Sequence, residues 1–350
     1  MGAADGALRF AGRTSEDPAL AASRWKALTG RKAVGCLPLF IPEEILHAAG
    51  MLPVTVRGDE YGDSPASWDV LDGWVFPPVP GLPSEPERFL TEAASGQPQV
   101  SLRFSPRSMK VPSTEETLDQ VERLREWAGE ISGRPASDGA LSKSISVYNE
   151  NRGFFSALER RLAASPGTYS ALEVFWLLRS AMALPREAHA LLLRAALSRD
   201  PAPGRHFRAR LFLGGRMPPR PVMEAIDRAG GVLVGDDLDA GHRTNEAMAD
   251  ERGDPLLALS RRLRAQLLGM AETEVEPSWA VRVLTRIEAS GADRFLYLAT
   301  GSAAFPEDAG KLAAEAGKRG IPFLCLELDS SSRFSEREKE MVSSFIASSG

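Results

Sequence analysis

Glu43, Glu44 and His47 are the first residues of this 350-residue chain whose types and spacing could do proton chemistry. Carboxylates and imidazoles are common general acids and bases in enzymes. The three residues lie within about one turn of a predicted helix that begins after Pro42. Adjacent helical side chains do not face each other, so Glu43 and Glu44 are also explained as the acidic first turn of a helix. His47 is spaced to pair with one of these carboxylates or to make a structural contact.

A second polar cluster follows a predicted buried strand. Its charged members include Asp236, Asp237, His242 and Arg243. An arginine can bind a phosphate through two parallel hydrogen bonds, so Arg243 could hold a phosphorylated ligand. Aspartates also favour the ends of helices, where they accept hydrogen bonds from free backbone N–H groups. The cluster is therefore a candidate binding site or a helix-capping group.

A third group, Asn149, Asn151 and Arg152, lies on a predicted helix that begins at Ser137. Its amides and guanidinium could orient the carbonyl group of a substrate. The same polar groups could instead form a hydrogen-bond network that ties two parts of the protein together. The sequence leaves both interpretations open.

Cys36 and Cys325 are the only cysteines in the chain. Two cysteines are too few to stabilise a disulfide-rich fold, and they cannot supply a three- or four-cysteine metal site from one chain. Cys36, in a predicted strand, is the candidate metal ligand. The alternative for both residues is a buried free cysteine that packs as a small apolar side chain. The four histidines are too scattered to indicate a zinc site.

Composition narrows the range of partners. A net charge of -5, with arginines interleaved among acidic residues, does not fit a nucleic-acid-binding surface, which needs clustered positive charge. No apolar run reaches the ~18 residues that a membrane span requires. The opening segment lacks the apolar core of a secretory signal. We therefore expect a cytoplasmic protein with neither nucleic acid nor a membrane as its partner.

Short apolar runs bounded by Pro or Gly predict two sets of β-strands. The first set comprises Ala33–Leu37, Leu52–Arg57, Gly73–Phe76 and Val100–Phe104. The second set comprises Arg208–Leu213, Gly231–Gly235, Phe295–Thr300 and Phe323–Leu328. Helical patterns between the strands indicate parallel sheets in the doubly wound arrangement, in which ligands bind at the carboxyl ends of the strands.

The predicted fold class is α/β, with two doubly wound parallel-sheet lobes joined by a helical middle segment. We assign residues 1–20 to a mobile tail, 21–135 to an N-terminal α/β lobe, 136–204 to a helical connector and 205–350 to a C-terminal α/β lobe. Within the first lobe, Ser113 followed three residues later by Glu116 predicts a capped helix start.

Several segments, in order along the chain, resemble the signatures of one protein family. They are PEEILHAAGMLPV at 42–54, LDGWVFP at 71–77, YNENR at 148–152, GDDLDAGHR at 235–243 and IPFLCLELD at 321–329. They are similar to segments of the 2-hydroxyacyl-CoA dehydratase D-component and benzoyl-CoA reductase subunit family.

This resemblance implies a function in acyl-CoA chemistry. Family members form heterodimers of two related subunits and hold [4Fe–4S] clusters on cysteines. They remove water from 2-hydroxyacyl-CoA thioesters or reduce an aromatic acyl-CoA, and a separate ATP-hydrolysing activator supplies the electron. By this resemblance the ligand is an acyl-CoA, and the residues expected to bind it are Asn149, Arg152, Asp236, Asp237, His242 and Arg243.

The chain departs from the family at the cluster cysteines. Iron–sulfur clusters need thiolate ligands, and the segment that follows Phe76-Pro77 holds no cysteine here. We therefore expect a cluster-poor or cluster-free subunit that shapes an acyl-CoA pocket, while a related cysteine-bearing subunit holds the [4Fe–4S] cluster. Two alternatives stay open: a catalytic iron–sulfur subunit with Cys36 as one ligand, and a non-enzymatic acyl-CoA-binding or regulatory protein.

Overall fold

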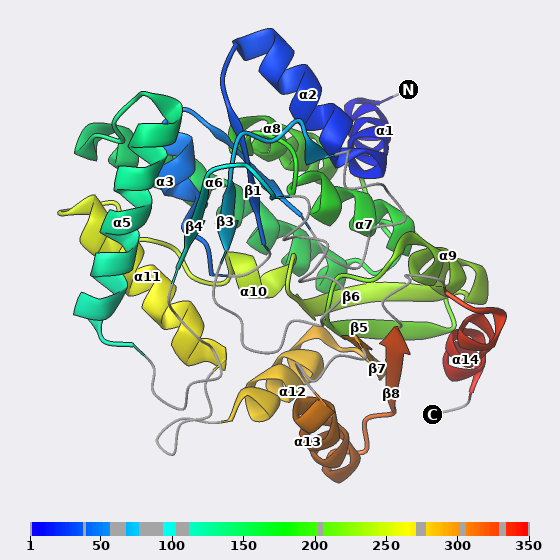
Figure 1. The fold of residues 1–350 in the computed structure, drawn as a ribbon. Helices are drawn as coiled ribbons and strands as arrows, with labels where there is room; N and C mark the ends of the chain where they lie inside the picture. The colour runs from blue at the N-terminus through cyan, green and yellow to red at the C-terminus, as the bar shows by residue number, and fades with distance from the viewer. Residues whose placement is uncertain are drawn as a thin grey trace.

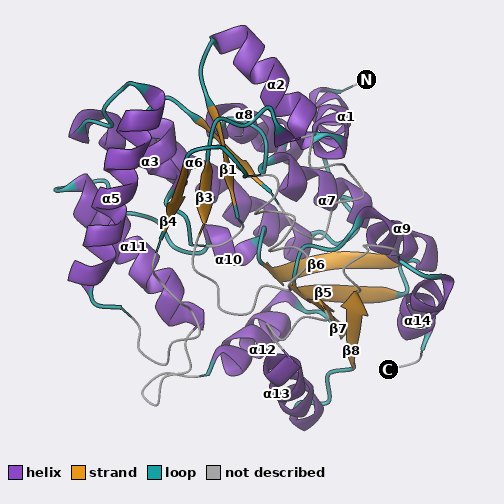
Figure 2. Ribbon diagram, viewed as in Figure 1, coloured by secondary structure: helices purple, strands orange, loops and turns teal. Residues whose placement is uncertain are grey.

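The computed structural model describes residues 2–37, 40–56, 68–76, 94–102, 112–201, 206–270, 278–300, 306–328 and 334–348. These residues form two parallel four-stranded sheets surrounded by helices (Figure 1). Figure 2 shows the same view with the helices and strands in contrasting colours. The α/β class and the two sets of strands expected from the sequence are confirmed. In the described part of the chain, no helix combines the length and apolar character needed to cross a membrane.

The first sheet has the strand order β2-β1-β3-β4, and all neighbouring strands are parallel. Its strands are β1 (Ala33–Cys36), β2 (Leu52–Thr55), β3 (Trp74–Phe76) and β4 (Gln99–Ser101). Gly35 permits the close approach of β1 to β3, because a Cβ atom there would lie 2.6 Å from the Trp74 ring. One face of this sheet shares a hydrophobic core with α3 (Glu43–Ala48), α5 (Thr114–Ser132) and α11 (Pro255–Met270). The other face shares a core with α2 (Pro18–Thr29).

The second sheet has the order β6-β5-β7-β8 and is also parallel. Its strands are β5 (Ala209–Gly215), β6 (Gly231–Leu238), β7 (Arg294–Thr300) and β8 (Phe323–Leu328). One face packs against α7 (Ala171–Ser180), α9 (Arg220–Ala229) and α14 (Glu336–Ala347), and the other against α12 (Trp279–Ser290) and α13 (Pro306–Lys318). In both sheets the strand order reverses beside the first strand, β1 or β5. Ligands of open α/β sheets bind at such reversals.

Helix α6 (Asp138–Ala164) contacts strand β6 of the second sheet and the helices α3 and α11, which pack on the first sheet. It begins where the sequence predicts, because the Ser137 hydroxyl accepts a hydrogen bond from the backbone N–H of Ala140 at 3.3 Å. Leu141 and Ile145 join the core of the first sheet, whereas Phe155 joins the core of the second. Helix α8 (Arg186–Leu197) packs beside α6, and the short α10 (His242–Asn245) follows β6. Side chains on α6 are thus placed where the two halves of the molecule meet.

The start of the chain differs from the expected mobile tail. Residues in this range form helix α1 (Ala3–Glu16), which packs against α7 and α8 with Leu8 and Ala11 buried. Asp5 also pairs with Arg199 at 3.0 Å. An alanine-rich helix with a narrow apolar stripe lacks the broad apolar pattern that marks a buried helix in a sequence, which is why composition alone suggested a tail.

Helix α11 differs from the domain ranges expected from the sequence. It falls within 205–350, but Leu259 and Leu263 belong to the core of the first sheet. It lies beside α5, as Figure 1 shows. The boundary drawn near residue 205 therefore does not separate the two hydrophobic cores, because α11 returns to the N-terminal side of the molecule.

Candidate functional site

Helix α3 brings the first three candidate residues to its contact with α6. Pro42 lies at the start of the helix, and Gly50, with φ at 78°, follows its end. Glu43 and Glu44 occupy the first turn, as the sequence predicts. Each of the two carboxylates has an arginine partner on another helix, so the acidic first turn also anchors α3 to its neighbours.

Glu44 lies at the centre of a buried charge network. Its side chain is 1% exposed, and its Oε1 atom accepts a hydrogen bond from Arg152 Nη2 of α6. Arg262 Nη1 of α11 lies 3.7 Å from the same oxygen. Burial would raise the pKa of Glu44, but Arg152 and Arg262 outweigh it and lower that pKa to about 2. Within the described residues Glu44 Oε2 has no hydrogen-bond partner.

Glu43 joins a second set of partners beside this network. Its Oε2 atom accepts hydrogen bonds from Arg186 Nη2 at 2.6 Å and from the Tyr148 hydroxyl at 3.3 Å. The Arg186 guanidinium also lies 5.3 Å from the centroid of the Tyr148 ring, within range of a cation–π contact. Burial and the nearby Glu43 carboxylate raise the pKa of Tyr148 well above its usual value. This phenol therefore stays protonated at neutral pH.

His47 does not pair with Glu43 or Glu44, which corrects one of the two interpretations of its spacing. Its Nδ1 atom lies 2.8 Å from Ser144 Oγ, and its Nε2 atom lies 3.0 Å from Glu187 Oε1. Ser144 Oγ also donates to the backbone carbonyl of Glu44 at 2.8 Å. The hydrogen bond from His47 lowers the pKa of Glu187. His47 therefore lies between a buried hydroxyl and a partly exposed carboxylate.

The asparagines of the YNENR segment hold other segments in place. Asn149 donates through Nδ2 to the Ala249 carbonyl at 2.8 Å and accepts from the Ala249 N–H at 3.1 Å. Arg152 Nη1 donates to Asn149 Oδ1 at 3.0 Å. Asn151 donates to the Arg186 carbonyl at 3.3 Å and contacts His189 Nδ1 at 3.0 Å. These contacts fit the interpretation of a structural network, and a role in orienting a substrate carbonyl stays a prediction.

Asp236 caps the turn after β6. Its Oδ1 atom accepts hydrogen bonds from the backbone N–H groups of Leu238 at 3.0 Å and His242 at 2.9 Å. Gly241 is needed in this turn, because a Cβ atom there would lie 2.0 Å from Asp236 Oδ1. Burial and the neighbouring Glu159 carboxylate raise the pKa of Asp236. This geometry matches the capping interpretation of the cluster.

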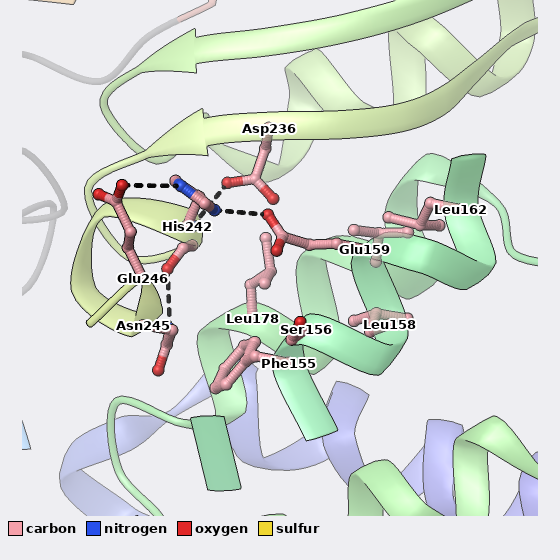
Figure 3. Close-up of a pocket in the computed structure, with 12 residues that line it drawn as sticks. Phe155, Ser156, Leu158, Glu159, Leu162, Leu178, Asp236, His242, Asn245 and Glu246 are labelled. Atoms are coloured by element: carbon pink, nitrogen blue, oxygen red, sulfur yellow. Dashed lines mark hydrogen bonds and ion pairs between the residues drawn. The ribbon is translucent and has the colours of Figure 1, made fainter. Parts of the chain in front are cut away.

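His242 faces a small cavity between α6 and α10 (Figure 3). Its Nδ1 atom lies 2.9 Å from Glu159 Oε1, and its Nε2 atom lies 3.9 Å from Glu246 Oε1. Burial alone would lower the pKa of His242, but its hydrogen bond to Glu159 and the nearby Glu246 carboxylate raise that pKa to about 9. The imidazole is therefore a cation at neutral pH and binds two carboxylates.

Asp237 and Arg243 form a buried ion pair. Both Nε and Nη2 of Arg243 lie near Asp237 Oδ2, at 2.8 and 2.7 Å. Arg286 Nη1 donates to Asp237 Oδ1 at 3.0 Å. The Arg243 guanidinium lies 4.9 Å from the centroid of the Trp279 ring. Arg243 would have to leave these partners to bind a phosphate in the bidentate manner that the sequence suggested.

Three cavities adjoin these clusters and share wall residues. The first, of about 280 Å³, is lined by residues that include His47, Tyr148, Arg186 and Glu187. The second, of about 40 Å³, shares Arg186 with the first and is also lined by Glu43 and Arg262. The third, of about 80 Å³, contains Glu159, Asp236 and His242, and shares Asn245 with the second.

Four charged residues that sequence reasoning missed complete the two clusters. Arg186 and Arg262 pair with the α3 carboxylates, and Glu159 and Arg286 complete the group around His242 and Asp237. Of the four, only Arg186 stands at a position that the sequence marks, because it follows the helix break at Pro185. The other three lie within regular helices, where a single charged residue is normally interpreted as part of a solvent-exposed face.

The residues present do not fit a [4Fe–4S] cluster. Cys36 is buried, and burial together with the nearby Glu43 carboxylate raises the pKa of its thiol well above the usual value. Cys325 lies on the second sheet, and burial and Glu327 raise the pKa of its thiol to about 11. A cluster needs several thiolates close together. Among the described residues, no group of three His, Cys, Asp or Glu side chains is placed to hold a metal ion.

The fold and the site define an α/β protein whose charged clusters gather at strand ends between two parallel sheets. The model of the "2-hydroxyglutaryl-CoA dehydratase, D-component" family matches residues 105–348, and the chain belongs to this family. The resemblance expected from the sequence motifs is confirmed.

Individual relatives are subunits of multi-subunit enzymes. A benzoyl-CoA reductase subunit of Thauera aromatica is 27% identical over 283 residues, which cover 69% of this chain and 70% of the relative. The lactoyl-CoA dehydratase subunit beta of Anaerotignum propionicum is 22% identical, with 94% and 95% covered. The (R)-phenyllactyl-CoA dehydratase beta subunit of Clostridium sporogenes is 22% identical, with 91% of each chain covered.

Proposed function

We propose that this chain is the cluster-free subunit of a 2-hydroxyacyl-CoA dehydratase or an aromatic acyl-CoA reductase complex. A related, cysteine-bearing subunit holds the [4Fe–4S] cluster, and an ATP-dependent activator supplies its electron. The present chain forms one wall of the acyl-CoA pocket. In this proposal the two sheets are the centres of two doubly wound lobes, and the helical middle segment joins them.

The observation that carries the proposal is the charge network beside Cys36. Burial, and after it the Glu43 carboxylate, raise the pKa of the Cys36 thiol, and Glu43 itself pairs with Arg186 at 2.6 Å. Glu44 in the next position pairs with Arg152. Burial above all disfavours the charged thiolate that iron would need. Ion pairs between helices therefore hold this region together, and the redox centre is assigned to the partner.

The candidate residues have different roles in this proposal. Glu43 and Glu44 are positioning residues that fix α3 on α6 and α8. His47, whose side chain is 21% exposed, lines the cavity of about 280 Å³ and is the group best placed there to exchange a proton with a bound molecule. Asn149, Arg152, Asp236, Asp237, His242 and Arg243 support the walls of the acyl-CoA pocket.

Anaerobic co-purification tests this proposal. The chain is expressed alone and together with a related cysteine-bearing subunit, and iron and acid-labile sulfide are measured in both preparations. We expect iron only in the complex, about four atoms per heterodimer for one cluster. We also expect dehydration or reduction of an acyl-CoA only when both subunits, the activator and ATP are present.

Two results would contradict this assignment. Failure of the chain to form a complex with any related subunit would remove the proposed role. Tight acyl-CoA binding by the isolated chain, with no turnover in any complex, would favour the non-enzymatic binding or regulatory protein instead.

A further inference from the structure

The cavity beside Arg262 lies in a region with an excess of buried positive charge. Arg152, Arg186 and Arg262 are 4 to 10% exposed at their side chains. Among the described residues their ion pairs are with two carboxylates, the buried Glu44 and the partly buried Glu43. A buried charge without a partner is costly, so such groups are normally neutralised by a counter-charge. The network of described residues is therefore one negative charge short of neutrality.

The other charged groups around this cavity do not remove the excess. Asp239 also lines the cavity, but its Oδ2 atom lies 3.9 Å from a further arginine, Arg216. Its Oδ1 atom accepts hydrogen bonds from the backbone N–H groups of Met217 and Ala240, each at 2.8 Å. The carboxylate of Glu251, which contacts Asn149, belongs to an exposed residue and is screened by solvent.

Arg262 lines the cavity, and its contact with Glu44 is longer than its two hydrogen bonds to backbone carbonyls. Its Nε atom donates to the Ala247 carbonyl at 2.8 Å and its Nη2 atom to the Thr244 carbonyl at 2.9 Å. Its Nη1 atom makes the longer contact with Glu44 Oε1, at 3.7 Å. Burial and the neighbouring Arg152 lower the pKa of Arg262 to about 9, so the guanidinium is still charged at neutral pH. A negative group beside Nη1 would offset the repulsion between the Arg262 and Arg152 guanidinium groups.

The lining of the cavity suits a small anion. Besides Arg262 and Arg186, it includes Thr55, whose hydroxyl can donate a hydrogen bond, and Asn245, whose Nδ2 atom already donates to the Gly241 carbonyl at 2.7 Å. Its volume of about 40 Å³ exceeds what one water molecule needs, and is too small for a sugar or a nucleotide. The cavity is built by residues of both halves of the chain, from Leu37 to Gln266.

We propose that this cavity binds a small monovalent carboxylate, held by Arg262 Nη1 and Arg186. The ligand supplies the missing negative charge and links α11 to α8 and the end of β2. This site does not depend on the proposed acyl-CoA function, because its lining residues all belong to this chain.

Formate is a suitable probe because of its size. The purified full chain is titrated with sodium formate at pH 7.5 by calorimetry, and its thermal unfolding is followed in parallel. Sodium HEPES, whose sulfonate is too bulky for the cavity, replaces formate at equal ionic strength. We expect saturable binding with a Kd on the order of millimolar and a rise in the unfolding temperature that follows the same saturation.

Two variants of neighbouring residues on α11 test the location. Arg262→Gln is expected to weaken formate binding at least tenfold. Arg261→Gln removes the same charge from an exposed position of the same helix and should change the affinity less than twofold. The proposal would be overturned if both variants lost the same affinity for formate, or if the wild-type chain showed no saturable binding.

A measurement on the wild-type chain avoids the risk that Arg262→Gln does not fold. Crystals grown in sodium bromide are examined for anomalous scattering from the bromide ion. We expect a peak next to Arg262 Nη1. Bromide peaks confined to the molecular surface would overturn the proposal.

Discussion

Glu44 on α3 and Arg152 on α6 form a buried ion pair across 108 residues of sequence. Both side chains are at most 4% exposed. The Coulombic gain of such a pair is largely offset by the cost of removing two charges from water, so its net contribution to stability is small. Removal of one partner is costly, since the other is left charged and buried. The pair therefore fixes the position of α3 on α6 more than it stabilises the fold as a whole.

The first prediction concerns loss of this carboxylate. Glu44→Gln leaves Arg152 and Arg262 without their buried counter-charge, and should lower the free energy of unfolding by about 3–5 kcal/mol. Urea denaturation of the wild type and the variant measures the change. The matched control is Glu150→Gln, at an exposed position of α6, which should change stability by less than about 0.5 kcal/mol. Similar stability of the two variants would contradict the role given to Glu44.

A second prediction follows from the lowered pKa of Glu44. Its folded-state pKa of about 2 lies below the ordinary value of 4.5, because Arg152 and Arg262 outweigh the effect of burial. The carboxylate therefore contributes stability that is present above about pH 4.5 and is lost as the pH falls toward 2. The difference in unfolding free energy between wild type and Glu44→Gln should shrink by about 3 kcal/mol over this interval. A difference independent of pH would count against an ionised Glu44.

A third prediction concerns His242, whose pKa shifts in the opposite direction. Its hydrogen bond to Glu159 and the nearby Glu246 carboxylate outweigh burial and raise the pKa from 6.5 to about 9. The stability that its charge contributes is fully present below about pH 6.5 and is lost as the pH rises through 9. His242→Gln should lack this loss of stability between pH 6.5 and 9.

Unfolding curves recorded from pH 6 to 10 measure this effect. His206→Gln, at an exposed position, serves as the control and should keep the wild-type profile. If the wild-type and His242→Gln profiles are parallel over this range, the pairing of His242 with the two glutamates is wrong.

A fourth prediction concerns the turn after β6. An alanine at Gly241 would place its Cβ atom 2.0 Å from Asp236 Oδ1 and displace the capping carboxylate. Gly241→Ala should therefore destabilise the protein by about 2 kcal/mol or more, through strain and the loss of the cap. Gly139→Ala in α6 is the control, because no atom lies within 4 Å of the added Cβ. That substitution should be neutral or stabilise the protein by up to about 1 kcal/mol.

The local elements of the fold could be predicted because their signals are contained in short segments. Ser113 and Glu116 form the capping box expected from their spacing, with hydrogen bonds of 3.1 and 2.7 Å. The apolar residues around Gly35 predicted a strand, and Pro42 with the acidic residues after it predicted the start of α3. The parallel arrangement followed from the alternation of strands and helices.

The partners of the candidate residues could not be predicted, because tertiary packing decides them. Arg262 reaches Glu44 only because α11 returns to the core of the first sheet. His47 contacts Ser144 on α6 and Glu187 on α8, although Glu43 and Glu44 are closer in sequence. Helical spacing indicates which side chains share a face of one helix, and it carries no information about the helix that packs against that face.

The most direct test of the central claim is the iron and acid-labile sulfide content of the isolated chain, purified without oxygen. We predict substoichiometric iron and no visible absorption of an iron–sulfur cluster, together with stoichiometric cluster in the complex with a related cysteine-bearing subunit. About four iron atoms and four sulfides per isolated chain would contradict the assignment of this protein as the cluster-free partner.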